Sequence, residues 1–179
     1  MGLIYSPRED SYLLYKEVKR RAKDKKVLDM GTGSGILAIG AKKGGAIEVL
    51  AVDINPDAVA FVKKKGVEAV ESDLFEKVNG KFDLIVFNPP YLPENESEDA
   101  ESKLATTGGK KGDEVILRFL EVVCKFLNSE GNVLLLVSNL TSTKRIEDLI
   151  QRKGLSKEVI ASEKLFMEEL FVWKLQRKF

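Results

Sequence analysis

The 179-residue chain contains no histidine and only one cysteine, Cys124. A single cysteine cannot form an internal disulfide, and without histidine a zinc site in this chain is not expected. The lack of histidine also removes the side chain that most often acts as a general base near neutral pH. We therefore expect no bound metal and a chemistry based on carboxylates, amides and the positioning of reactants.

The chain also lacks an excess of charge and a long apolar run. With 29 basic and 28 acidic residues the net charge is +1, so no overall field attracts the protein to nucleic acid. The apolar run at 133–137 is far too short to span a membrane, and we find no signal peptide. We expect a cytoplasmic protein with no membrane partner. Its 44% apolar residues predict a single domain over residues 1–179 with a substantial core.

Strand-like and helix-like patterns alternate along the chain, which indicates βαβ units on a largely parallel sheet. The last two strand patterns, at 155–164 and 170–174, follow each other directly and indicate an antiparallel hairpin at one edge. The sequence therefore predicts an α/β fold with a mostly parallel, seven-stranded sheet. We expect the other strands at 26–30, 49–53, 67–71, 82–87 and 132–138, and helices from Ser6, from Ile36 to Gly44, from Asn55 to Gly66, at 113–127 and at 142–153.

The most informative motif is Asn88-Pro89-Pro90-Tyr91, directly after the strand expected at 82–87. The amide oxygen of Asn88 and a nearby backbone carbonyl can each accept an N–H from one –NH2 group. Pro89 stiffens the turn because its φ is fixed, and Tyr91 can cover the face of a planar group. The motif therefore indicates a site for a planar nitrogen group, although Asn-Pro also starts ordinary turns.

A glycine-rich motif follows the strand expected at 26–30. Glycines let the backbone approach a ligand closely, and Asp53, at the end of the next strand, can bind both ribose hydroxyls of a nucleoside. The spacing is G-x-G-x-G and not the dinucleotide pattern G-x-G-x-x-G. We therefore interpret it as a site for S-adenosylmethionine. The residues of this motif are Asp29, Gly31, Thr32, Gly33 and Gly35.

The first four strands each end in one of these candidate residues: the glycine motif, Asp53, Asp73 and Asn88. In a doubly wound sheet, ligands bind at the edge where the strands have their carboxyl ends. Asp73 can accept a hydrogen bond from the adenine amine, with Leu74 beside the ring, although an aspartate is also common in an ordinary turn. Together the four motifs predict the Rossmann-like class I methyltransferase architecture.

These motifs resemble the HemK-like N5-glutamine methyltransferases, in particular their short, single-domain branch. The likeness covers nearly the whole chain and is carried by residues 5–11, 29–35, 53–56, 88–91 and 108–112. The resemblance implies that the Asn88–Tyr91 turn is catalytic and contacts both the acceptor and the cofactor. It also implies cofactor contacts at Ser11, Ile54 and Leu74, and substrate contacts at Asn88, Pro89, Tyr91, Gly108 and Gly109.

The resemblance further implies a substrate and a partner. Members of this branch methylate the glutamine of the Gly-Gly-Gln motif in class I peptide release factors, and they commonly form a heterodimer with a small zinc-binding activator. We expect the strand at 67–71 to be an outer strand, where a partner can cover the open edge.

The chain departs from the family pattern at two positions. Ser11 stands where threonine is usual, and it keeps the hydroxyl group. Thr106 and Thr107 stand where an aromatic residue is common, which weakens the assignment of the substrate loop at Gly108 and Gly109. The segment 6–9 is also fully explained as a helix cap, so its cofactor role depends on the resemblance alone.

Two other functions compete with glutamine methylation. The Asn88 motif is shared with enzymes that methylate adenine N6 or guanine N2, so it identifies a nitrogen acceptor and not glutamine itself. A flipped base would need a basic track for phosphates, whereas five acidic residues follow the motif within 94–101. A nucleic-acid substrate is therefore the less favoured alternative. A non-catalytic binding scaffold is disfavoured by the intact Asn88 and glycines.

Overall fold

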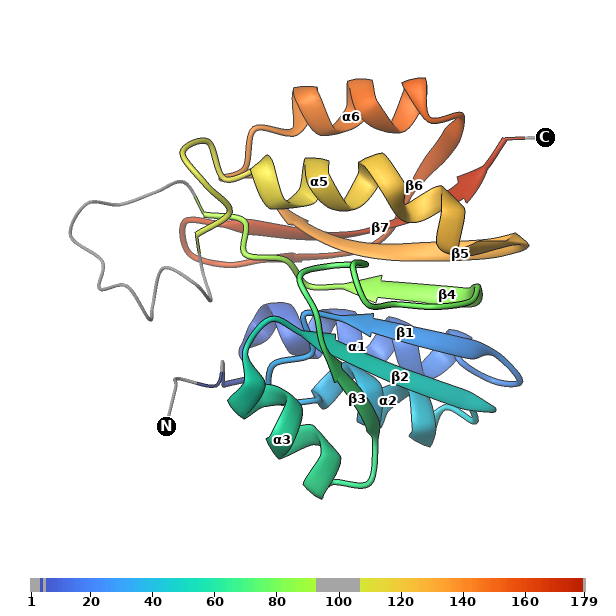
Figure 1. Ribbon diagram of the computed structural model, residues 1–179. Coiled ribbons are helices and arrows are strands. Elements are labelled where there is room, and N and C mark those ends of the chain that lie inside the picture. The colour runs from blue at the N-terminus through green and yellow to red at the C-terminus, as the bar shows by residue number, and fades with distance from the viewer. Residues whose placement is uncertain (1–3, 5, 93–106, 179) are drawn as a thin grey trace.

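The computed structural model describes Ile4 and residues 6–92 and 107–178. Seven strands form one sheet in the order β3-β2-β1-β4-β5-β7-β6 (Figure 1). The first five are parallel to one another, β7 runs antiparallel to β5, and β6 and β7 form an antiparallel hairpin, as predicted. The strands are β1 (Lys26–Met30), β2 (Glu48–Asp53), β3 (Glu68–Glu71), β4 (Phe82–Phe87), β5 (Leu127–Ser138), β6 (Leu155–Lys164) and β7 (Glu169–Arg177).

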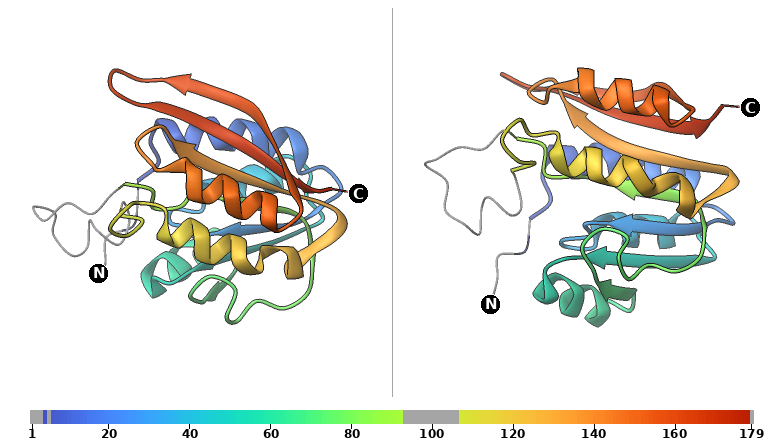
Figure 2. Two further views of the ribbon diagram at one scale, coloured as in Figure 1. Left: turned by 90° about the horizontal axis from the view of Figure 1, so that it is seen from above. Right: turned by 45° about the horizontal axis from the view of Figure 1, so that its top comes forward.

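Helices cover both faces of the sheet, and each face has its own apolar core (Figure 2). On one face lie α1 (Glu9–Arg21), α2 (Ile36–Lys43) and α3 (Pro56–Lys64); on the other lie α5 (Glu114–Val122) and α6 (Thr143–Arg152). Because both faces are covered, the central strands are almost continuously apolar, and β5 is fully buried from Val133 to Ser138. The predicted α/β class and the outer position of β3 are confirmed.

The first helix begins later than predicted. Helix α1 starts at Glu9, and its N-cap is Arg8 in extended conformation, so the predicted capping role of Ser6 is wrong. The local pattern was ambiguous because proline suits an extended segment as well as a first helical turn. In the structure the carboxylate of Asp10 accepts a hydrogen bond from the Ser11 amide at 2.6 Å, which satisfies one free donor of the first turn without Ser6.

The strand β5 is longer than predicted and the helix before it is shorter. Helix α5 ends at Val122, a 3₁₀ helix (Val123–Phe126) follows, and Leu127 already pairs with Phe82 of β4. A β-bulge separates this pair from the regular ladder, and a side chain at Gly131 would come within 2.9 Å of the Phe82 carbonyl oxygen. Pairing with a buried neighbour strand therefore overrides the helical pattern of the local sequence.

The long connection predicted between Leu92 and Lys111 is described only at its ends. Residues 93–106, which include the acidic stretch, lie outside the described residues. At the ends, Leu92 and Thr107 form an isolated bridge, and the Gly108 amide donates to the Leu92 carbonyl at 2.9 Å. Within 6–92 and 107–178, no helix has the length and apolar character that crossing a bilayer requires. The single domain over 1–179 and the cytoplasmic location stay predictions.

Candidate active site

Two adjoining pockets lie at the carboxyl ends of the parallel strands, where the sequence predicts the ligand site. They share Gly31, Asp53, Ile54 and Pro90, so they form two halves of one cleft. We call the half that includes Asn88 and the start of α1 the acceptor half, and the half beyond β2 the nucleoside half. The acceptor half also has Ser11, Thr32, Gly33, Pro89 and Tyr91 in its wall, and the nucleoside half has Asp73, Leu74 and Gly109.

Three predicted residues line neither half: Asp29, Gly35 and Gly108. Gly35 is the N-cap of α2 and has a left-handed φ of 78°. A Cβ at this position would lie 2.9 Å from a methyl group of Val62 on α3, so only glycine fits there without movement. Gly35 therefore shapes the glycine loop and does not contact the cleft.

Asp29 lies fully buried behind the glycine loop. One carboxylate oxygen accepts from the Thr32 hydroxyl at 2.6 Å and from the Ala38 amide at 3.0 Å. The other oxygen has no hydrogen-bond partner within the described part of the chain. Burial raises the pKa of Asp29 to about 7, although the two hydrogen bonds oppose this shift. The observed contacts of Asp29 are thus with the loop and with the first turn of α2.

Asp53 at the end of β2 is held by backbone amides on both sides. One oxygen accepts from Gly33 at 2.8 Å, and the other accepts from Asn55 at 2.9 Å. Burial raises the pKa of Asp53, and these amide hydrogen bonds act against that effect. Because a carboxylate offers about four lone-pair positions, Asp53 can still accept hydrogen bonds from the hydroxyl groups of a ligand in the cleft.

The nucleoside half has one feature that the sequence did not reveal. Asp73 forms an ion pair of 2.7 Å with Arg118 on α5, and both side chains are partly exposed. Leu74 next to it has a φ of 47°, which is unusual for a residue with a branched side chain. Backbone strain of this kind often occurs at ligand sites, and the Ser72 hydroxyl supports the turn by donating to the Leu74 carbonyl at 3.0 Å.

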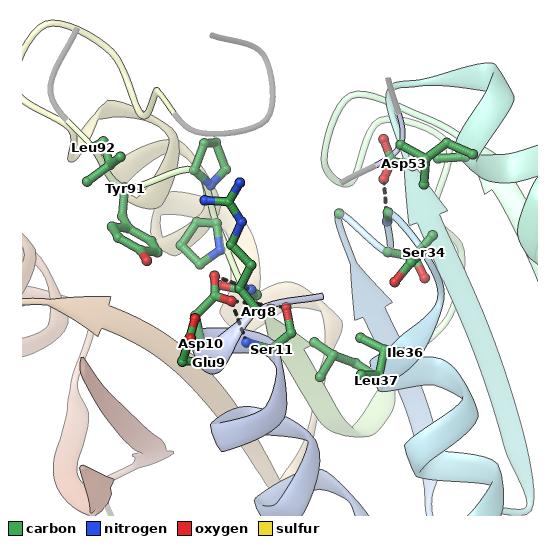
Figure 3. A pocket seen from close by; sticks show the side chains of 18 of the residues that line it. Arg8, Glu9, Asp10, Ser11, Ser34, Ile36, Leu37, Asp53, Tyr91 and Leu92 are labelled. Atoms are coloured by element: carbon green, nitrogen blue, oxygen red, sulfur yellow. Dashed lines mark hydrogen bonds between the residues drawn. The ribbon is translucent and has the colours of Figure 1, made fainter. Parts of the chain in front are cut away.

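In the acceptor half, the two ends of the Asn88 amide have different surroundings. The amide nitrogen donates to a carboxylate oxygen of Asp10 at 3.1 Å, across 78 positions of sequence. The amide oxygen is buried and has no hydrogen-bond partner among the described residues. Figure 3 shows Asp10 and Ser11 at the start of α1 on one side of this pocket and Asp53 on the other. Asp10 is itself buried.

The turn around Asn88 is held by two other segments. The Thr141 hydroxyl, after β5, donates to the Tyr91 carbonyl at 2.9 Å. Gly108 packs so closely that a Cβ there would lie 2.5 Å from the Pro90 carbonyl oxygen. Gly108 therefore packs against the backbone of the turn, whereas its neighbour Gly109 is part of the wall of the nucleoside half.

Sequence reasoning did not predict several residues of the cleft, among them Asp10, Arg118, Leu165 and Glu168. Asp10 lies in the segment 5–11 that carried the family resemblance, so an available signal was not used. Leu165 and Glu168 belong to the turn between β6 and β7, and Glu168 has a buried carboxylate oxygen without a partner in the described structure. No local motif marks these two residues or Arg118.

With this geometry in place, comparison with known proteins identifies the family. Residues 9–167 match the family described as the methyltransferase small domain. The chain belongs to this family. Membership confirms the prediction of a class I methyltransferase that uses S-adenosyl-L-methionine. This match and the relatives described next together confirm the resemblance to the HemK-like N5-glutamine methyltransferases, and they do not test the role of any single residue.

Individual members of the family resemble the chain over nearly its whole length. A relative from Methanocaldococcus jannaschii, named "Putative protein N5-glutamine methyltransferase", is 42% identical over 96% of this chain and 92% of its own. Human methyltransferase HEMK2 is 29% identical over 97% of this chain and 90% of its own. The solved complex of E. cuniculi Mtq2 with Trm112, described as responsible for methylation of the termination factor eRF1, contains a similar chain. It has 28% identity and a TM-score of 0.80, and the match covers 97% of this chain and 98% of that one.

Proposed function

We propose that this methyltransferase transfers a methyl group to the side-chain amide nitrogen of a glutamine, in the Gly-Gly-Gln motif of a class I peptide release factor. The observation that carries this proposal is the Asn88 amide. Asn88 lines the acceptor half, and its amide oxygen is buried without a partner among the described residues, whereas its amide nitrogen donates a hydrogen bond to Asp10. A buried acceptor of this kind is costly unless a ligand supplies the missing donor.

Asp10 determines which end of the Asn88 amide is available. An ionised carboxylate only accepts hydrogen bonds, so it can bind the amide nitrogen of Asn88 but not the amide oxygen. The oxygen is then left to accept an N–H of the incoming –NH2 group. With the Pro89 carbonyl as the second acceptor, both protons of a primary amide can be bound. In this arrangement Asn88 orients the nitrogen, which is a poor nucleophile because its lone pair is delocalised.

The described residues of the cleft fit the cofactor S-adenosyl-L-methionine. Asp53 would bind the ribose hydroxyls, Asp73 the adenine amine, and the glycine loop with Ser11 the methionine end. When bound, the cofactor supplies an electrophilic methyl group on a sulfonium centre. The Arg118 side chain competes for Asp73 in the structure, so we propose that this ion pair loosens when adenine binds.

A protein glutamine is favoured as the acceptor over a nucleic-acid base. The relatives with high coverage include one named for protein N5-glutamine methylation and one from a complex described as methylating a termination factor. Among the described residues, the wall of the acceptor half has a single basic side chain, that of Arg8, against four acidic ones: Glu9, Asp10, Asp53 and Glu168. A phosphate backbone would be repelled by this surrounding, whereas an uncharged glycine-rich peptide would not.

We further propose that a small zinc-binding activator forms a heterodimer with the chain at the outer edge of β3. This strand pairs only with β2 among the described strands, which leaves backbone groups on its other side for a partner strand. The E. cuniculi relative is found in a complex with Trm112. The zinc would belong to the partner, since the described part of this chain has no cluster of metal ligands.

Mass spectrometry of a release factor incubated with the enzyme and cofactor tests the proposed function. We expect one added methyl group on the glutamine of the Gly-Gly-Gln motif. A Gln→Asn release factor should react poorly, because its amide is one methylene closer to the backbone. Both reactions should be run with the chain alone and with a co-expressed zinc-binding activator.

Transfer RNA, ribosomal RNA and DNA are the comparison substrates. Methylated nucleic acid together with an unmodified release factor would establish the adenine or guanine reaction and overturn the proposal. If co-expression yields no complex and no gain in solubility or activity, the proposed partner at β3 is wrong, whatever the substrate.

A further inference from the structure

Apolar side chains are exposed at the same edge of the sheet as the acceptor half. Phe166 is 100% exposed and Met167 79% exposed in the turn between β6 and β7, and Leu140 is 46% exposed in the loop after β5. We call these three residues the rim patch. Their two loops meet at this edge because β7 runs antiparallel to β5, so that Leu170 pairs with Ser138 (Figure 1).

The rim patch is fixed relative to the acceptor half by hydrogen bonds. The turn is closed by a bond from the Leu165 amide to the Glu168 carbonyl at 2.7 Å. Asn139 joins the two loops, because its amide donates to the Glu169 carbonyl at 3.0 Å and its side chain accepts from the Glu169 amide at 2.9 Å. The exposed side chains are therefore held on an anchored hairpin.

The same two loops also touch the acceptor half directly. Leu165 and Glu168, which flank the exposed pair, are in the wall of that pocket. Thr141, next to Leu140, donates to the Tyr91 carbonyl of the catalytic turn at 2.9 Å. A molecule whose acceptor group enters the pocket would thus extend across the rim patch as soon as it left the pocket mouth.

The chemistry of the rim patch suits a folded polypeptide. An exposed phenylalanine and methionine contribute to binding when a partner buries them. The charged neighbours are Lys164 on one side and Glu168 and Glu169 on the other, so the turn has no excess of positive charge for phosphates.

We propose that the rim patch is the docking surface for the body of the protein that carries the acceptor glutamine. This inference rests on the proposed function and adds to it a second contact region, outside the pocket. The pocket would select the glutamine, and the rim patch would increase affinity for the folded substrate. A short peptide that contains only the Gly-Gly-Gln motif would fill the pocket without reaching the rim patch.

The test is a double variant, Phe166→Ser with Met167→Ser, in the full chain with its activator if one is required. We expect KM for the release factor to rise tenfold or more, with kcat within about twofold of the wild type. Kinetics on the short Gly-Gly-Gln peptide and affinity for the cofactor should not change. Because both side chains are exposed, the melting temperature should also stay the same.

The matched control is Ile47→Ser. Ile47 is 73% exposed, but it directly precedes β2. It therefore lies at the amino ends of the parallel strands, opposite to the carboxyl ends where the rim patch lies. This variant removes a similar apolar side chain and should leave all kinetic constants unchanged. An equal rise of KM in the control would mean that general surface polarity, and not the rim patch, determines affinity.

Three results would overturn the docking surface. They are an unchanged KM for the release factor, an equal loss on the short peptide, and a loss of activator binding or of self-association in the double variant. The wild-type reactions separate this failure from failure of the proposed function. A wild-type enzyme that methylates the release factor, with a double variant of normal KM, disproves only the rim patch. A wild-type enzyme that neither binds nor methylates the release factor disproves both.

Discussion

Two regions of the cleft hold their polar side chains in different ways. At the end of β2, Asp53 is held by the amides of Gly33 and Asn55, which belong to the same βαβ unit. In the acceptor half, Asn88 is held by Asp10 from the start of the chain, and its turn is supported by Thr141 from beyond β5. The region at the ends of β1 and β2 is therefore held by local contacts, whereas the Asn88 turn is held by distant segments.

This difference predicts how variants in the two regions should behave. Local contacts place the carboxylates of the β1–β2 region, so changes there should affect stability or cofactor affinity. Distant contacts place the Asn88 amide, so changes there should affect turnover and leave cofactor binding intact. Four variants test this separation, in order of decreasing expected effect.

The largest expected effect concerns the pH dependence of stability through Asp29. Its pKa is about 7 in the folded protein against an ordinary value of 3.8, because burial disfavours the charged form. Between these pH values the unfolded state releases the proton and the folded state keeps it, so this group makes the wild type less stable as pH rises. Asn at position 29 cannot titrate. Relative to Asp29→Asn, the free energy of unfolding of the wild type should therefore fall by roughly 3–4 kcal/mol between about pH 4 and pH 7.

Urea unfolding of the cofactor-free protein across this pH range measures the Asp29 effect. The difference in the free energy of unfolding between Asp29→Asn and the wild type should level off above about pH 8, because Asp29 is then ionised in both the folded and the unfolded state. Asp148→Asn on the exposed surface of α6 is the matched control for the loss of one carboxylate. A pH dependence for Asp29→Asn no larger than that of the control would show that burial does not raise the pKa of Asp29.

The next largest effect is expected for Asn88→Ala. Removing one preorganised polar contact at a reacting group lowers turnover by about 10²–10³-fold. Cofactor affinity should change little, since Asp53 and the glycine loop remain intact. Single-turnover kinetics and calorimetry measure the two quantities separately, and turnover near the wild-type level would exclude the Asn88 turn from the mechanism.

For Asp53→Ala we expect the opposite pattern. Loss of the partly buried carboxylate leaves the Gly33 and Asn55 amides and the ribose hydroxyls without this partner, so cofactor affinity should fall by roughly 1–3 kcal/mol. At saturating cofactor, kcat should stay within severalfold of the wild type. Calorimetry with S-adenosylmethionine and with NAD provides the check, and tight binding of NAD alone would refute the cofactor assignment.

The smallest effect is expected for Asp10→Asn. An amide at this position can both donate and accept, so the Asn88 side chain is no longer held in one orientation. We expect kcat to fall about tenfold, equivalent to about 1.4 kcal/mol, with unchanged cofactor affinity. The same change in the Asn88→Ala background should have little further effect if Asp10 acts through Asn88.

Asp148→Asn serves as the charge-matched control for Asp10→Asn too. Equal losses of turnover for Asp10→Asn in both backgrounds would mean that Asp10 has a separate structural or cofactor-binding role. A loss of cofactor affinity would contradict the division between the two regions.

Much of the fold was predictable because local patterns dictate it. The strand at Lys26–Met30 and the helix that begins after Gly35 have the predicted bounds, since apolar runs and glycines act over a few residues. The predictions of where α1 starts and of how long β5 is were wrong. In both places the local pattern suited two conformations, and contacts made by Asp10 and by Phe82 selected one of them.

The sequence by itself determined the order of strands and helices, the glycine loop, and the places of Asp53 and Asn88 at the ends of their strands, because each of these depends on residues close by in the chain. Only the tertiary structure decided which end of the Asn88 amide is hydrogen-bonded to Asp10, the pairing of Asp73 with Arg118, and the exposure of Phe166 and Met167 at the rim. These features join segments that lie 45 to 78 positions apart or depend on where a hairpin turn meets another loop. No local spacing encodes such contacts, because they arise only when the sheet brings its carboxyl ends to one edge.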